Sequence, residues 1–170
     1  MEVLYKKAAI EDINTLTEIR IKVLRAANKL PETTDMSRVR AETLRYYKKA
    51  LLDGTHVACL AYEGGKFAGA GGICFYTVMP TVHNPSGEKA YIMNMYTEPQ
   101  YRRNGVAYGM LDMLVNEARA RGIQAIFLEA TDMGRPLYEK YGFVQMQMEM
   151  ELPEKETKLP EPKPDQMENV

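Results

Sequence analysis

The sequence predicts an α/β (α+β) protein with a mixed, mostly antiparallel central sheet flanked by helices. Apolar residues recur with a period of two in some segments and of 3.6 in others, which indicates strands and helices that follow one another along the chain. Two predicted strands are joined across Gly64-Gly65, a hairpin signal, whereas a later strand, helix and strand form a crossover. Antiparallel and parallel pairing are therefore both expected in one sheet.

The first elements are a strand and two helices. Residues 3–7 form the strand candidate, and residues 11–28 carry apolar side chains at helical spacing behind two acids that favour the positive end of the helix dipole. After a polar connection over 29–35, Ser37 is expected to cap a second helix over 37–52, because a serine hydroxyl can accept from a free N–H of the first turn.

The middle of the chain predicts three strands and a long helix. The hairpin strands span 56–63 and 66–78, and a further strand spans 90–97. A helix with one apolar face follows over 105–121 and ends at Gly122, a residue suited to the left-handed conformation beyond a helix end.

The last elements are a strand over 125–131, a short helix and a final strand. Pro136 suits the first turn of the short helix, which is expected to end near Gly142. Residues 143–152 alternate between apolar and polar side chains and predict the last strand.

Chain length and composition fit one domain followed by a tail. The 170 residues are 45% apolar and 26% charged, as in ordinary globular proteins. From residue 153 onward, prolines stand among glutamates and lysines with almost nothing apolar to offset the entropy of ordering. We expect the domain to span 1–152 and the Pro/Glu/Lys-rich segment 153–170 to be a flexible tail, with partner binding as an alternative role.

Charge and cysteine content argue against several classes of protein. A net charge of -1 lacks the broad basic footprint of a nucleic-acid binder. Cys59 and Cys74 lie in apolar runs without the spacing of metal ligands, so neither a disulfide framework nor a metal site is expected. No apolar run approaches the length of a membrane span and the first residues do not resemble a signal peptide. We expect a cytoplasmic protein with no membrane partner.

A strand that runs through a short loop into a helix can bind phosphate, because free N–H groups and the helix dipole meet there. Here the loop and first helical turn read Arg102, Arg103, Asn104, Gly105, Val106 and Ala107. Gly105 can adopt a positive φ, and the small Ala107 leaves the first turn open to an anion. Taken alone, this pattern fits a solvated arginine pair beside an ordinary helix start equally well.

The sequence resembles the GCN5-related N-acetyltransferase (GNAT) family, which transfers an acetyl group from acetyl-CoA to an amine. The run Arg102-x-x-Gly105-x-Ala107 resembles the family's pyrophosphate loop, and residues 95–99, Met-Tyr-Thr-Glu-Pro, are similar to the end of its fourth strand. Residues 137–143, Leu-Tyr-Glu-Lys-Tyr-Gly-Phe, are similar to its Leu-Tyr-Glu-Lys-x-Gly-Phe signature. The predicted order of elements is also the family's, so the resemblance covers roughly residues 3–152 and implies the GNAT fold.

The resemblance implies acetyl-CoA as co-substrate and assigns residues to it. Residues 102–107 would bind its pyrophosphate, and the backbone of Met95 and Thr97 would pair with its pantetheine, with the Met95 N–H also stabilising an oxyanion. Tyr138 corresponds to the tyrosine that protonates the departing thiolate, and Glu129 to a glutamate that some members use as base. The alternative for Met95 and Thr97 is an ordinary strand position, and for Tyr138 a packing aromatic.

The implied function is N-acetylation of a primary amine, in a small molecule or a peptide, by direct attack in a ternary complex. Neither cysteine lies in a recognisable nucleophile setting, which disfavours an acetyl-enzyme. A catalytically weak acyl-CoA-binding sensor or interaction module is the alternative, and a nucleotide or nucleic-acid binder fits the near-neutral charge poorly.

Two features concern the acceptor and possible partners. The family's acceptor site is shaped by regions that correspond to 29–35 and 79–89, where Glu32, Asp35 and Glu88 could form a negative rim suited to a cationic amine. Homodimers are common in the family, so a homodimer is a possible assembly here, and residues 145–150 would then form its interface or pack inside.

Overall fold

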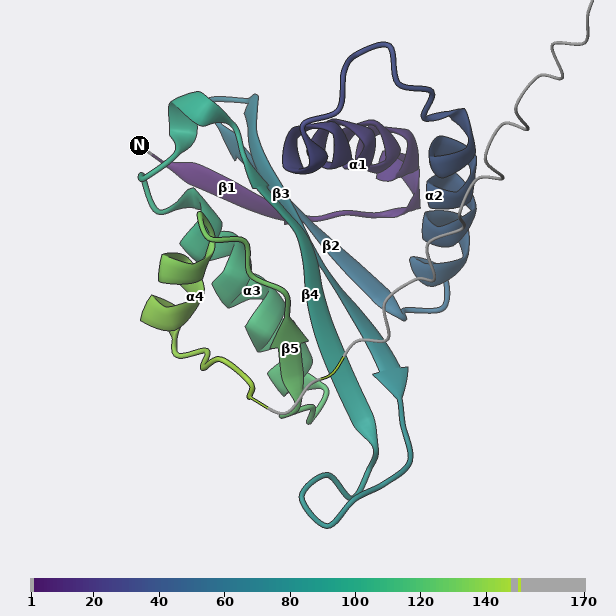
Figure 1. Cartoon of the computed structure of the whole chain (residues 1–170), viewed down its shortest axis with the longest axis vertical. Helices are drawn as coiled ribbons and strands as arrows, with labels where there is room; N and C mark the ends of the chain where they lie inside the picture. Colours follow the sequence, from purple (N-terminus) through teal and green to yellow (C-terminus); the bar gives the residue numbers. More distant parts are fainter. Residues whose placement is uncertain (1, 148–149, 151–170) are drawn as a thin grey trace, which may run out of the picture.

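The computed structural model describes residues 2–147 and 150, and within them five strands form one sheet in the order β1-β2-β3-β4-β5 (Figure 1). The strands are β1 (Val3–Lys7), β2 (His56–Glu63), β3 (Lys66–Thr77), β4 (Glu88–Thr97) and β5 (Ile126–Leu128). The first four pair antiparallel in sequence order, and β5 lies parallel to β4. The predicted mixed, mostly antiparallel sheet is therefore confirmed.

Helices cover both faces of the sheet, as Figure 1 shows. The helices are α1 (Ile13–Asn28), α2 (Ser37–Ala50), α3 (Val106–Ala120) and α4 (Arg135–Tyr141), with single turns η1 (Ile10–Asp12) and η2 (Pro99–Tyr101). The pair α1 and α2 packs on one face, and the pair α3 and α4 packs on the other. No helix in the described residues is both long and apolar enough to cross a membrane.

Strand β2 separates the two hydrophobic cores. Cys59 and Ala61 pack toward α3, whereas their neighbours Ala58 and Leu60 pack toward α1, and all four side chains are at most 1% exposed. Successive strand residues point to opposite faces, so a strand buried on both sides has an almost unbroken apolar sequence.

The start of α2 differs from its prediction. Ser37 is the first helical residue rather than the cap, and its own N–H donates to the Asp35 carboxylate at 2.9 Å. This bond lowers the pKa of the Asp35 carboxyl. Met36, which is buried, occupies the cap position, and the Asp35 carboxylate accepts at the helix start in place of the Ser37 hydroxyl.

The predicted last strand over 143–152 is wrong for the residues that the structure describes there, because 143–147 form no strand. Phe143 packs back against the rings of Tyr138 and Tyr141, each at 6.1 Å between centroids, and Arg135 donates to the Gln145 side chain at 2.9 Å. These contacts hold the chain beside α4. Residues 148–149 and 151–170, including the predicted tail, lie outside the described residues.

Candidate active site

Strands β4 and β5 separate halfway along β4. Their pairing ends at Ile92 and Leu128, where β5 stops, whereas β4 stays paired with β3 as far as Thr97. In the described part of the chain, residues 93–97 therefore have no strand on their β5 side. The free backbone groups of such an edge can pair with an extended ligand.

A β-bulge lies in this part of β4. Asn94 and Met95 both stand opposite Gly71 of β3, and Asn94 has a left-handed backbone with φ 58°. The side chain of Asn94 holds this conformation, since its Oδ1 accepts from Arg20 Nη1 at 3.2 Å and its amide hydrogen-bonds to the Tyr47 hydroxyl. Side chains of α1 and α2 therefore hold the bulge in place.

The bulge decides which backbone groups face the gap. The Ala90 N–H points to the β5 side, where it donates to a carbonyl at 2.9 Å, whereas the Glu98 N–H points to β3 and donates to Ala68 at 2.9 Å. Alternation back from Glu98 turns the N–H groups of Met95 and Thr97 toward the gap. Without the extra residue the parity would be reversed. These are the two residues that the family resemblance assigns to pantetheine.

Thr97 and Met95 contribute further contacts at the gap. The Thr97 carbonyl accepts from Arg102 Nε at 3.1 Å, and the Thr97 hydroxyl is buried without a partner in the described residues. Met95 packs its side chain on the α3 face, over Gly71, where a Cβ atom would stand 2.5 Å from the Met95 sulfur. The assignment of both residues to the cofactor stays a prediction.

The start of α3 presents a row of free N–H groups. Gly105 precedes the helix with φ 81° and Arg103 has φ 62°, so the loop turns sharply before Val106 enters the core at 1% exposure. The first backbone bond of the helix runs from Gly109 to Gly105 at 3.0 Å, so the N–H groups of the first turn have no acceptor within the helix. The geometry fits an anion at this end of α3.

The charged side chains of the loop are exposed and have no carboxylate partner in the described residues. Arg102 is tied to the Thr97 carbonyl, Arg103 and Asn104 extend into solvent, and Ala107 is half-buried. Fixed positive charge therefore lies beside the free N–H groups.

Tyr138 lies on the same face of the sheet as α3. Its ring is 8% exposed and packs in the α3 core, and its hydroxyl makes no hydrogen bond to any described residue. Burial raises the pKa of Tyr138, so the phenol stays protonated at neutral pH. The neighbouring Tyr141 differs, because its hydroxyl donates to Asp112 at 2.9 Å.

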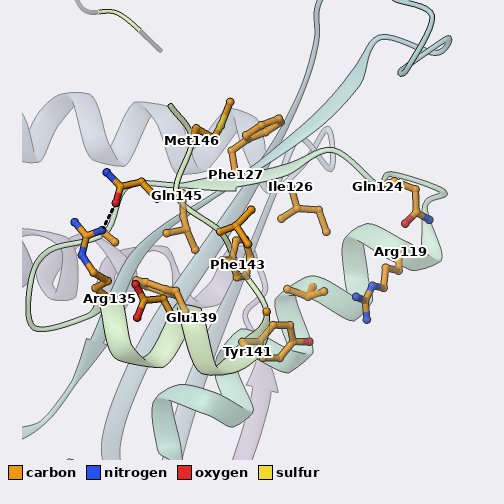
Figure 2. A pocket seen from close by; sticks show the side chains of 16 residues that line it. Arg119, Gln124, Ile126, Phe127, Arg135, Glu139, Tyr141, Phe143, Gln145 and Met146 are labelled. Atoms are coloured by element: carbon orange, nitrogen blue, oxygen red, sulfur yellow. Dashed lines mark hydrogen bonds between the residues drawn. The ribbon is translucent and has the colours of Figure 1, made fainter. Parts of the chain in front are cut away.

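Tyr138 also lines a cavity of about 480 Å³ between β5, α3 and α4. Figure 2 shows this cavity, with Ile126 and Phe127 of β5 on one side and Tyr141 and Phe143 on the other. Its walls are partly polar, since they include Arg119, Arg135 and Glu139. A phenol without a hydrogen-bond partner is a proton donor without an acceptor, as a general acid needs to be before its substrate arrives.

Glu129 lies directly after β5 and is exposed. Its carboxylate hydrogen-bonds to the Tyr91 hydroxyl, and burial together with this bond raises the pKa of Tyr91 to about 12. Tyr91 pairs with Cys74 and lies on the face of α1 and α2. Glu129 and Tyr138 thus lie on opposite faces of the sheet, and the role of Glu129 as base stays a prediction.

A second cavity, of about 540 Å³, lies between α1, α2 and strands β2 to β4. The sequence pattern did not predict this cavity. The structure places Asn94 in the cavity wall with Arg20 and His56. His56 is 2% exposed, burial lowers its pKa to about 4, and its Nδ1 lies 3.0 Å from the Tyr46 hydroxyl. Because residues two apart on a strand share a face, the position of His56 two residues before Ala58 could have placed it on the α1 and α2 face.

The expected acidic rim does not line either cavity. No residue of 29–35 or 79–89 belongs to their walls. Asp35 accepts from the Ser37 N–H at the start of α2, and Glu88 begins β4 at the far end of the hairpin. The charged lining of the second cavity includes Arg20 and Arg38 instead.

The cysteines are poor nucleophiles in this fold. Burial raises the pKa of the Cys59 thiol to about 12 and also raises that of Cys74, so both stay protonated at neutral pH. Among residues 2–147 and 150, no cluster of three or more histidine, cysteine or acidic side chains could hold a metal ion.

Comparison with known proteins gives consistent matches. The model described as the acetyltransferase (GNAT) family matches residues 23–143. A predicted acetyltransferase from Clostridium acetobutylicum, solved with acetyl-CoA, is 39% identical and superposes with a TM-score of 0.81 over 89% of this chain and 96% of that chain. No curated protein matches the sequence significantly.

Two more distant structures share the fold. A GCN5-related N-acetyltransferase from Ralstonia eutropha JMP134 is 24% identical, with a TM-score of 0.76 over 89% of this chain and 98% of that one. An aminoglycoside acetyltransferase from an uncultured soil metagenomic sample, in complex with sisomicin, is 12% identical, with a TM-score of 0.68 over 90% and 95%.

Proposed function

Because the chain belongs to the GNAT family of acetyltransferases, as its sequence motifs indicated, we propose that it transfers the acetyl group of acetyl-CoA to a primary amine by direct attack in a ternary complex. The observation that carries this proposal is the open edge of β4 beside the first turn of α3, whose N–H groups have no acceptor within the helix. The Tyr138 hydroxyl, which has no hydrogen-bond partner in the described residues, lies on the face of the sheet that α3 covers.

The residues present fit acetyl-CoA. The N–H groups of 103–108, with Arg103 beside them, would bind the pyrophosphate, and the gap-facing backbone of Met95 and Thr97 would hold the pantetheine arm. When bound, the cofactor supplies an activated acetyl group. The Met95 N–H would donate to the thioester oxygen and stabilise the negative charge that develops there.

The proposed acid and the proposed base lie on opposite faces of the sheet, so the two proton transfers would take place on different sides of it. Tyr138, on the α3 face, would donate its proton to the departing thiolate. Burial raises the pKa of the Tyr138 phenol above its ordinary value, so the phenol stays protonated at neutral pH until the thiolate forms. Glu129, on the α1 and α2 face, would accept the proton that the attacking amine releases. Direct attack is supported by the buried, protonated Cys59, which could not carry an acetyl group without first losing its proton.

The test is thiol release from acetyl-CoA across a panel of amines, amino acids, peptides and aminoglycosides. Turnover that depends on both substrates and gives the acetylated amine supports the proposal. Tight binding of acetyl-CoA by calorimetry without thiol release for any amine would refute it and would favour a sensor or interaction module.

A further inference from the structure

The cavity between α1, α2 and strands β2 to β4 opens on the face of the sheet opposite the phosphate-binding loop. Its wall includes Met93 and Asn94, the β4 residues that immediately precede the gap-facing Met95. An acceptor in this cavity would therefore reach the gap from the side that acetyl-CoA leaves free. This placement rests on the proposed function.

Two arginines in the wall of this cavity lack an anionic partner. Arg20 is half-buried and donates only to the neutral Asn94 side chain, and Arg38 is exposed. Neither has a carboxylate within 4.0 Å among the described residues. A guanidinium that is partly removed from water is stabilised by an anion that binds beside it.

The other titratable groups in the wall do not supply that anion. Glu42 is the acidic residue of the lining, and both of its carboxylate oxygens accept from Arg45, at 2.6 and 2.5 Å. His56 is neutral at physiological pH because burial lowers its pKa to about 4. The cavity therefore presents a net positive charge to its ligand.

The rest of the wall is largely apolar. Leu24, Val39 and Met93 contribute aliphatic surface, and Tyr46 contributes an aromatic ring that packs edge to face with His56 at 5.5 Å. Such walls favour an apolar or aromatic body and strengthen the attraction of a carboxylate to Arg20, because water screens that pair less.

We propose that this cavity binds the acceptor, and that the acceptor is an amine which also carries a carboxylate and an apolar or aromatic body, as in an apolar amino acid or short peptide. Its carboxylate pairs with Arg20 and Arg38, its body lies against Leu24 and Met93, and its amine reaches the gap beside Asn94. Polycationic amines such as aminoglycosides are excluded by the same two arginines, although an acetyltransferase of that class shares the fold.

The test compares matched acceptors that differ only in charge. Apolar amino acids and dipeptides are assayed for thiol release beside their C-terminal amides and the corresponding amines without a carboxylate, together with one aminoglycoside. The free acids should be preferred over their amides by about tenfold or more in kcat/KM, the usual size of a hydrogen-bonded charge pair.

Substitutions of the two arginines test whether they bind the carboxylate of the acceptor. Arg38→Gln, at an exposed position, should reduce the preference for the acid toward unity and leave the KM for acetyl-CoA unchanged, and Arg20→Gln should do the same if the protein stays folded. Arg40→Gln is the control, because Arg40 lies on the same helix but pairs with Glu18 of α1 and does not line the cavity.

The outcomes separate this inference from the proposed function. Equal or better use of amides, plain amines or the aminoglycoside would overturn the inference and leave the acetyltransferase standing. An acid preference that survives in Arg38→Gln and in a folded Arg20→Gln would also overturn it. Failure of every amine to release thiol would overturn both.

Discussion

Replacement of Tyr138 by phenylalanine should remove catalysis without removing stability. The substitution deletes one hydroxyl, which makes no hydrogen bond to any described residue, and keeps the ring that packs on Phe143 at 6.1 Å. We therefore expect the free energy of unfolding to change by less than about 0.5 kcal/mol. Loss of a positioned general acid should lower kcat by about a hundredfold, which is about 2.7 kcal/mol in the barrier.

Tyr141→Phe is the matched control on the same helix. Its hydroxyl donates to Asp112 of α3 at 2.9 Å, so its loss should lower the free energy of unfolding by about 1 kcal/mol. Because Tyr141 has a partner already, kcat should stay unchanged. The two variants thus predict opposite patterns of activity and stability.

The assay is thiol release at saturating acetyl-CoA and amine, combined with urea unfolding of each variant. Since burial raises the pKa of Tyr138 above its ordinary value of about 10, the group stays protonated through the neutral range, and kcat should show no alkaline loss below about pH 10. An unchanged kcat in Tyr138→Phe, or an equal loss of kcat in Tyr141→Phe, would refute the assignment of the acid.

Three further predictions concern the cofactor loop, the bulge and a buried histidine. Gly105→Ala places a side chain at φ 81°, which costs about 1–2 kcal/mol and reorients the N–H groups of the first turn. The Kd for acetyl-CoA, measured by calorimetry, should therefore rise about tenfold. Gly54→Ala, at φ 72° near the other end of α3, is the control and should leave this Kd unchanged. Gly71→Ala brings a Cβ within 2.5 Å of the Met95 sulfur and should cost about 1–3 kcal/mol of unfolding free energy, measured in urea; an unaltered midpoint would show that Met95 moves freely. The pKa of His56 is about 4 in the folded state against about 6.5 unfolded, so the unfolded chain binds more protons between these values and the free energy of unfolding should fall by up to about 3 kcal/mol as pH falls from 6.5 to 4. His56→Gln should abolish this slope and the exposed His83→Gln should keep it, and the reverse result would assign the slope to another group.

Features that depend on neighbours in sequence could be predicted closely. The strands Val3–Lys7 and His56–Glu63 have the bounds that their alternation predicts. The positive φ expected for Gly105 is observed, because a loop that turns directly into a helix needs it there. The predicted cap of α2, Ser37, lies one residue after the observed N-cap Met36, and the accepting side chain is that of Asp35, because both polar residues can accept an N–H and their sequence does not distinguish them.

The predicted strand over 143–152 shows where local pattern fails. Alternation indicates how side chains divide between two faces, but a strand also needs a partner edge. The neighbouring β5 has three residues, and Phe143 is drawn into the core beside Tyr138, so residues 143–147 follow α4 instead.

The sequence by itself determined the family, the order of elements as far as α4 and the loop at the start of α3, because motif spacing and hydrophobic period are local properties of the chain. Tertiary structure decided the rest of the candidate site. The bulge at Asn94 sets which backbone groups face the gap, Tyr138 and Glu129 fall on opposite faces, and Arg20 reaches a cavity formed by five elements. These properties depend on register and packing between segments distant in sequence, and the residues of one segment alone do not fix them.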